Sequence, residues 1–179
     1  MSLEQHKAAP ARPIGFAVLT ISDTRTGGAG SAPDRGGDFL VQSLLAAGHR
    51  VVLREWSLDE SGPIEQAVRR AADHPDVELV LTTGGTGIAP RDVTFPTLRR
   101  VLDSEIPGFG ELFRQLSFRE IGSATMLSRA IGGLLAGRVV LALPGSPKAL
   151  KLAMEQIVLP EAAHLVNQAR GPGPASGPP

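Results

Sequence analysis

Residues 14–22, IGFAVLTIS, constrain the possible folds more than any other stretch of the chain. They form an almost continuous apolar run, as expected of a strand that is buried on both faces of a sheet. Strand-like segments recur at residues 49–56, 77–83, 131–135 and 138–143, and most of them alternate with helical segments. This alternation predicts an α/β fold of three layers, in which helices cover both faces of a mostly parallel sheet.

The expected helices are marked by their end residues and by apolar residues at helical spacing. A helix from about residue 34 to 47 ends at Gly48, a residue suited to the left-handed turn after a helix. The next helix carries apolar residues at i, i+3, i+4 and i+7, namely Ile64, Ala67, Val68 and Ala71.

Further helices are expected in the second half of the chain. Thr94 is placed to cap a helix that runs to residue 102. The last long helix begins near Ser146, Pro160 interrupts it, and a short helix completes the fold. The helix between these two would present four apolar residues on one face: Phe109, Leu112, Phe113 and Leu116.

Length and composition exclude several classes of function. The 179 residues fit one folded domain, which we place at residues 14–169, between a flexible arm at 1–13 and a disordered Pro/Gly tail at 171–179. The formal net charge is zero, and the chain has only six Phe, one Trp and no Tyr. Both features argue against a nucleic-acid surface. The absence of cysteine excludes disulfides and thiolate chemistry. No apolar run reaches membrane-spanning length and the first residues lack the core of a signal peptide, so a cytoplasmic protein without membrane contact is expected.

Polar and glycine-rich segments follow the carboxyl ends of the predicted parallel strands. These segments are Ser22-Asp23, residues 57–60, residues 84–87 and residues 144–148, whereas the amino ends carry ordinary turn residues. In open α/β sheets, ligands bind outside the carboxyl ends of the strands. The sequence therefore predicts a binding site at this edge of the sheet.

The loop Gly84-Gly85-Thr86-Gly87 is the candidate anion cradle of this site. Glycines directly after a buried strand let backbone N–H groups approach an anion closely. The loop lacks the Lys-Ser/Thr ending of a P-loop and the third glycine of a dinucleotide-binding motif, so a tight strand-to-helix turn is the alternative interpretation. Asp92 lies five residues beyond the loop and supplies the acidic group that a metal–phosphate site needs. Alternatively, Asp92 caps the next helix or pairs with Arg91.

The other polar segments also have structural alternatives. Asp59 could open a helix, and Ser22-Asp23 could close a turn. The segment SATMLSR, residues 123–129, offers hydroxyls and a guanidinium for a phosphate or a polar heterocycle, or forms a capped helix. Ser146 is expected at a helix N-terminus, where an anion is favoured, and Lys148 either adds a positive charge there or is solvated.

Two kinds of chemistry find no support in the residue pattern. The histidines at positions 6, 49, 74 and 164 have no ligand spacing, so a zinc site is not expected. Neither a G-x-S-x-G motif nor a Ser-His-Asp arrangement supports a hydrolase.

Four motifs in a fixed order identify a family resemblance. They are TTGGTG followed by PRDVT, then EIPGFGELFR, then SATMLSRA, then LALPGSPKAL. The series resembles the MogA/MoaB family of molybdenum-cofactor biosynthesis proteins, which is similar to the gephyrin G domain, and it covers residues 14–165. The resemblance implies a mostly parallel sheet with a small β-hairpin excursion. It also implies trimers, or hexamers made of two trimers.

The resemblance further implies a reaction and roles for individual residues. Molybdopterin and Mg-ATP would give adenylyl-molybdopterin and pyrophosphate. Asp92 and Asp59 match acidic residues of the catalytic site, and Asp59 could hold Mg²⁺ through water, although Leu58 stands where the family usually has proline. The loop residues Gly84, Gly85, Thr86 and Gly87 match the nucleotide-phosphate contact. Eight residues match the loops around the pterin and its phosphate: Ser22, Asp23, Thr125, Ser128, Arg129, Gly145, Ser146 and Lys148.

The second half of the chain is closer to the MoaB branch than to the MogA branch, and MoaB-type proteins are not all adenylyltransferases. A non-catalytic molybdopterin-binding or scaffold protein is therefore the alternative hypothesis, and an unrelated nucleotide-binding module is a third. The intact Asp59, glycine loop and Asp92 favour the enzyme. Its expected partners are molybdopterin, ATP, further copies of itself and the enzyme that inserts molybdate downstream.

Overall fold

The computed structural model describes residues 12–24 and 32–171. The expected arm at 1–13 and tail at 171–179 therefore lie almost entirely outside the described residues. In chain order the elements are β1 (Gly15–Ile21), α2 (Arg35–Ala46), β2 (Arg50–Ser57), α3 (Ser61–Asp73), β3 (Leu79–Thr83), α4 (Thr94–Val101), β4 (Ser104–Glu105), α5 (Pro107–Ile121), the 3₁₀ helix η1 (Gly122–Leu127), β5 (Ile131–Leu135), β6 (Arg138–Leu143), α6 (Pro147–Ala153), the π-helical turn η2 (Met154–Val158) and α7 (Leu159–Arg170).

The strands form one six-stranded sheet in the order β2-β1-β3-β6-β5-β4. The first four of these run parallel, while β5 pairs antiparallel with both β6 and β4. β5 and β6 form a hairpin whose turn residues, Ala136 and Gly137, both have positive φ, as a tight hairpin turn requires. The predicted mostly parallel α/β fold with a hairpin is confirmed. The two-residue edge strand β4 was not predicted.

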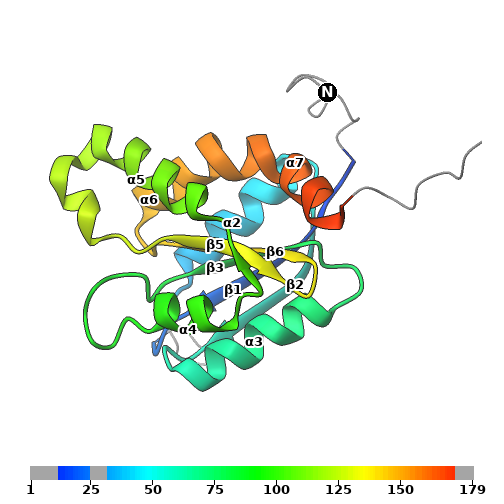
Figure 1. Cartoon of the computed structure of the whole chain (residues 1–179), viewed down its shortest axis with the longest axis horizontal. Coiled ribbons are helices and arrows are strands. Elements are labelled where there is room, and N and C mark those ends of the chain that lie inside the picture. Colours follow the sequence, from blue (N-terminus) through cyan, green and yellow to red (C-terminus); the bar gives the residue numbers. More distant parts are fainter. Residues whose placement is uncertain (1–11, 25–31, 172–179) are drawn as a thin grey trace, which may run out of the picture.

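Helices cover both faces of the sheet (Figure 1). α2, α5, α6 and α7 lie on one face, and α3 and α4 lie on the other. Alternate residues of β1 serve the two layers: Phe16 and Val18 face the first group of helices, and Ala17 and Leu19 face the second. All four side chains are fully buried, which explains why the β1 sequence is apolar at nearly every position. Each large apolar side chain buried in this way contributes about 1.5–3 kcal/mol to folding.

The two helices predicted in the first half are confirmed. Gly48 follows α2 with φ +80°, and the four apolar residues predicted for α3 are buried. On α5, Phe109 and Phe113 are buried and Leu116 packs against the same core, whereas Leu112 is 40% exposed and Ser117 lies on the buried face. The predicted apolar face of α5 is therefore confirmed at three of its four positions and wrong at Leu112.

Two residues that were expected to cap or interrupt a helix in the second half of the chain do not do so. Thr94 is the first residue of α4, its N-cap is Val93, and the Thr94 hydroxyl caps nothing. Pro160 does not end the helix, because α6, η2 and α7 follow one another without a loop. A proline lacks the N–H of an α-helical bond and its ring crowds the preceding turn, and the wider π-helical turn directly before it accommodates both effects.

A buried carboxylate fixes both ends of the described chain at the amino edge of the sheet. Glu78 is 6% exposed and accepts hydrogen bonds from Arg12, from Arg170 and from the Gly15 N–H. Burial alone would raise the pKa of Glu78, but these partners outweigh it and lower the pKa to about 2. No helix in the described part of the chain is long and apolar enough to span a membrane.

Candidate active site

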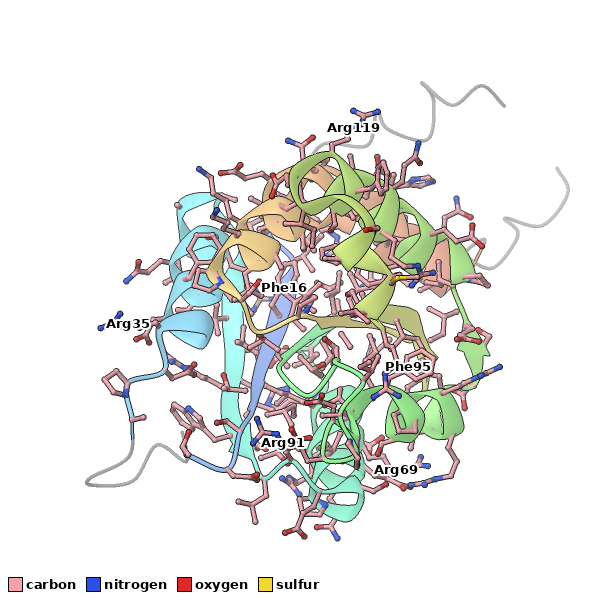
Figure 2. All side chains as sticks on the ribbon, turned by 90° about the vertical axis from the view of Figure 1, so that its left-hand side faces the viewer. Phe16, Arg35, Arg69, Arg91, Phe95 and Arg119 are labelled. Carbon is pink, nitrogen blue, oxygen red and sulfur yellow. The ribbon has the colours of Figure 1, made fainter. Side chains whose placement is uncertain are left out.

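The carboxyl ends of β1, β2, β3 and β6 meet at one edge of the sheet, as the strand pairing requires. Figure 2 views the molecule from this side, with Arg91 and Phe95 labelled in and just beyond the loop after β3. Contacts between the loops confirm the predicted convergence. The N–H of Ser22 donates to Ser57, the N–H of Asp59 donates to Oδ1 of Asp23, and Gly84 abuts Gly145.

The loop after β3 needs glycine at two positions for different reasons. Gly84 has φ +108°, and a Cβ there would collide with the carbonyl oxygen of Ile21. Gly85 has φ +62°, and a Cβ there would collide with the Thr94 hydroxyl and lie 2.7 Å from Oδ1 of Asp59. At both positions the positive φ favours glycine, and the close approach of β1, of the segment after β2 and of α4 leaves no space for a side chain.

The N–H groups of this loop divide into two sets. The Gly84 N–H donates to the Leu143 carbonyl at 3.2 Å, so Gly84 shapes the loop without offering a donor. The N–H groups of Gly85, Thr86 and Gly87 have no acceptor within the described chain. Three consecutive free N–H groups in a glycine turn are the usual components of a phosphate-binding nest.

Asp59 lies directly against this loop. Its carboxylate does not cap α3, whose N-cap is Glu60, so the helix-opening alternative is not realised. Oδ1 of Asp59 is buried and has no hydrogen-bond partner within the described chain. Burial raises the pKa of Asp59, and the negative charges of Asp23 and Asp92 raise it further, against a hydrogen bond from the Val93 backbone and the charge of Arg91. A carboxylate held in this environment favours a bound cation.

Asp92 closes a turn inside the same loop. Its Oδ2 accepts the Ala89 N–H at 2.9 Å, and its own N–H donates to the Ala89 carbonyl at 2.9 Å. It neither caps α4 nor forms an ion pair with Arg91 within the described chain. The carboxylate also contacts the loop backbone, because a Cβ on Gly87 would come within 2.6 Å of Oδ2. Asp59 and Asp92 therefore lie beside the first and last of the free N–H groups.

Thr94 is a residue of this site that its sequence position did not reveal. It is completely buried, and its hydroxyl has no partner within the described chain, although it points at the same face of Gly85 as Asp59. Its N–H donates to the Gly85 carbonyl at 3.1 Å. A buried hydroxyl without a partner costs free energy, so a ligand or an ion that accepts or supplies a hydrogen bond would relieve that cost.

The segment SATMLSR lies next to the loop after β3, and its polar side chains differ in whether they have hydrogen-bond partners. Thr125 is buried and donates to the Arg114 carbonyl, and the Ser128 hydroxyl is buried without a partner within the described chain. The Arg129 side chain donates to backbone carbonyls of the loop after β3. Of the three residues predicted to contact a substrate here, Thr125 has its hydroxyl bonded, Arg129 has Nε and Nη2 bonded, and Ser128 keeps its hydroxyl uncommitted.

The Ser22-Asp23 segment follows β1. The Ser22 hydroxyl accepts the Thr24 N–H at 3.3 Å, so the predicted alternative of a local turn is realised for Ser22. Asp23 instead reaches across to the segment after β2, where its Oδ1 accepts the Asp59 N–H at 3.0 Å. This bond fixes the backbone that carries Asp59.

The segment after β6 borders a cavity. Ser146 caps α6 by accepting the Ala149 N–H, and the exposed Lys148 lies two residues further on, in the first turn of the helix. Together with α5 they line a cavity of about 310 Å³, which adjoins a second hollow of about 570 Å³ through Lys148, Leu152, Ile121 and Glu120.

Ser117 of α5 also lines the smaller cavity and was missed at the sequence level. The signal was present, because Ser117 follows Phe109 and Phe113 at helical spacing and so places a hydroxyl on the buried face of α5.

The acidic residues of the site suit one mode of metal binding. No group of three or more His, Asp or Glu side chains that could hold a metal occurs within the described ranges. Mg²⁺ is commonly held by only one or two carboxylates together with substrate phosphates. The partnerless Oδ1 of Asp59, next to three free N–H groups, fits that mode of binding.

Comparisons with known proteins show what the chain is similar to. The profile of a family described as "Probable molybdopterin binding domain" matches residues 17–164. The molybdenum cofactor biosynthesis protein B of Bacillus cereus is 46% identical over 166 residues, which cover 92% of this chain and 96% of that protein. A crystal structure of a molybdenum cofactor biosynthesis protein B matches with a TM-score of 0.83 at 46% identity, covering 90% of this chain and 98% of that one. The tungsten cofactor synthesizing protein MoaB from Pyrococcus furiosus matches with a TM-score of 0.79 at 34% identity, covering 89% and 99%.

Proposed function

The chain belongs to the family of molybdopterin-binding domains that includes the MoaB and MogA proteins of molybdenum-cofactor biosynthesis, and we propose that it adenylylates molybdopterin with Mg-ATP. The observation that carries this proposal is the row of free N–H groups at Gly85, Thr86 and Gly87 between two carboxylates. The N–H groups suit nucleotide phosphates, and the carboxylates suit the cation that accompanies them.

In the proposed reaction a terminal phosphate oxygen of molybdopterin attacks the α-phosphorus of ATP. A new P–O bond forms, the bond between the α-phosphorus and its bridging oxygen to the β-phosphate breaks, and pyrophosphate leaves with that oxygen. The attacking phosphate is already ionised at neutral pH, so no side chain needs to remove a proton. The protein contributes alignment of the two phosphates and stabilisation of the charge that develops on the α-phosphoryl oxygens.

Individual residues have separate parts in this proposal. The N–H groups of residues 85–87 bind the phosphoryl oxygens of the nucleotide, and the turn closed by Asp92 holds that loop in shape. Asp59 holds Mg²⁺, with the Thr94 hydroxyl as a neighbouring polar group. When bound, Mg²⁺ neutralises phosphate charge.

The cavity between α5 and α6 is the proposed pterin pocket. It has about 310 Å³ of space, its walls include Ile121 and Leu152, and Ser117, Ser146 and Lys148 supply polar groups. It borders the loop after β6, and Gly145 of that loop lies against Gly84. A pterin in this cavity would therefore lie beside the loop after β6, which contacts the start of the glycine loop.

The proposal is tested by incubating the purified protein with molybdopterin and Mg-ATP and measuring pyrophosphate. We expect release that depends on both substrates, and we expect Asp92→Asn to abolish it. The asparagine side chain can still accept the Ala89 N–H, so the variant tests the charge with the turn preserved. Wild-type protein that binds molybdopterin without releasing pyrophosphate would instead identify a non-catalytic molybdopterin-binding protein.

We also propose that the protein self-associates as a trimer or hexamer. Four large apolar side chains near the end of α5 and in η1 are at least half exposed, namely Phe118, Ile121, Met126 and Leu127. Neighbouring exposed apolar side chains of this size are typical of an interface. Light scattering of the purified protein distinguishes three or six copies from a monomer.

A further inference from the structure

A single arginine ties the loop after β3 to a distant part of the chain. Arg129 lies between η1 and β5, about 40 residues beyond that loop. Its backbone N–H donates to the Thr86 carbonyl at 3.0 Å, and its Nε donates to the Gly87 carbonyl at 2.7 Å. Its Nη2 donates to the carbonyls of Gly87 and Asp92, the latter at 2.6 Å. The guanidinium also stacks over the ring of Phe95, with 5.3 Å between Cζ and the ring centroid.

We propose that Arg129 is a positioning residue for the glycine loop and Asp92, and that it does not itself contact the anionic substrate. Its Nε and Nη2 are directed at carbonyl oxygens of the loop, and one face of the guanidinium is covered by Phe95. An arginine that binds a phosphate directly would point this fork of donors at the ligand. Here two of its three nitrogens, Nε and Nη2, point at the backbone.

The geometry of the peptide group explains why this matters for the site. In a trans peptide the carbonyl and the N–H point in opposite directions, and the described chain contains no cis peptide bond. The bond from Arg129 to the Thr86 carbonyl therefore turns the Gly87 N–H away from Arg129. In the same way, the bond to the Asp92 carbonyl fixes the backbone that carries the Asp92 carboxylate. Arg129 thus aligns a free N–H group and a carboxylate at once.

Lysine cannot reproduce this arrangement. An ammonium group is a point charge without the planar fork of donors and without the flat face that stacks on an aromatic ring. Arg129→Lys therefore separates the two roles. It preserves a positive charge for a substrate anion, but it loses the simultaneous bonds to Gly87 and Asp92.

The first test uses the ligand-free protein and is independent of the proposed reaction. Hydrogen exchange measured by mass spectrometry should show the hydrogen-bonded amides of this loop, those of Gly84, Ala89 and Asp92, exchanging about tenfold faster or more in Arg129→Lys than in wild type. Phe95→Leu, which keeps the hydrogen bonds and removes the ring, should lie between the two. Arg99→Lys, a change of the same type at an exposed position on α4, should match wild type. Unchanged exchange in Arg129→Lys would overturn the proposal.

The second test rests on the proposed adenylylation. A positioning role predicts that kcat falls about tenfold or more in Arg129→Lys while KM for ATP and for molybdopterin changes little. A higher KM with unchanged kcat would instead assign Arg129 to substrate binding and overturn the proposal. If wild type releases no pyrophosphate, the proposed function fails, and the exchange measurement still decides the role of Arg129.

Discussion

Gly85 and Asp59 are packed so closely that a methyl group on the glycine would lie 2.7 Å from Oδ1 of the carboxylate. The two residues belong to segments after different strands, β3 and β2. Their contact exists because both strands run parallel to β1, which lies between them, and end at the same edge of the sheet. The contact places Oδ1 of Asp59 beside three free N–H groups. This oxygen is buried and has no hydrogen-bond partner within the described chain. This contact is the basis of the proposed site.

Gly85→Ala should damage both folding and activity. The left-handed backbone conformation at this position costs alanine about 1–2 kcal/mol of folding free energy, and its methyl group would also displace Thr94 or Asp59. Urea denaturation should show a loss of about 2 kcal/mol or more. Gly62→Ala is the matched control, because a Cβ at this helical position meets no atom within 4 Å, so it should be neutral or stabilising. Equal effects of the two substitutions would contradict the packing of Gly85.

Asp59→Asn should make the protein more stable and less active. Burial and the charges of Asp23 and Asp92 raise the pKa of Asp59, so the charged form is disfavoured in the folded state and a neutral amide is better tolerated. Thermal unfolding should show a gain of about 0.5 kcal/mol or more, and turnover should fall about 100-fold. A variant that loses stability as well would show that the Asp59 carboxylate is structural.

Thr94→Val tests the buried hydroxyl that has no partner within the described chain. Removing an unsatisfied hydroxyl should raise the free energy of unfolding by about 1 kcal/mol and reduce turnover. Thr97→Val is the control on the same helix, because the Thr97 hydroxyl is bonded to Ser61 Oγ at 2.8 Å. That variant should lose about 1 kcal/mol. A destabilised Thr94→Val would mean that its hydroxyl is already satisfied in the folded protein.

Glu78 should make stability depend on pH in acid. Its folded pKa of about 2 lies below the ordinary 4.5, so its contribution is complete above pH 4.5 and is lost as the pH falls toward 2. Glu78→Gln should therefore cost about 3 kcal/mol at neutral pH, and its deficit relative to wild type should shrink on acidification. Urea midpoints between pH 2 and 7 measure this. Glu111→Gln, at an exposed position, should leave the curve within about 0.5 kcal/mol of wild type.

The sequence was sufficient to predict five of the six strands of the described sheet, the first two helices and the edge of the sheet where the loops meet. These features follow from local patterns, such as the apolar run of β1 and the glycine after α2, combined with the rule that parallel strands end together. The glycine loop, Asp59 and Asp92 were found in this way, and the structure brings them into contact. Their chemical roles stay predictions.

The remaining features depend on contacts between residues far apart in the sequence. The bonds from Arg129 to Gly87 and Asp92 join residues about 40 positions apart, and Glu78 joins Arg12 to Arg170. No local pattern encodes such pairs. The Thr94 hydroxyl was misassigned because a threonine before an apolar helix is typical of a cap, and only the position of Val93 shows that it is not one. Pro160 was misassigned because the compensating π-helical turn has no signature in the sequence.

The most direct test of the account follows the phosphorus atoms of ATP. Protein incubated with molybdopterin and Mg²⁺ is given ATP labelled at the α-phosphorus in one sample and at the γ-phosphorus in another. Adenylyl transfer predicts that the α-label moves to the pterin and that the γ-label appears only in pyrophosphate, in equal amounts, with both signals lost in Asp92→Asn. Transfer of the γ-label to the pterin, or no transfer of either label by protein that binds molybdopterin, would contradict it.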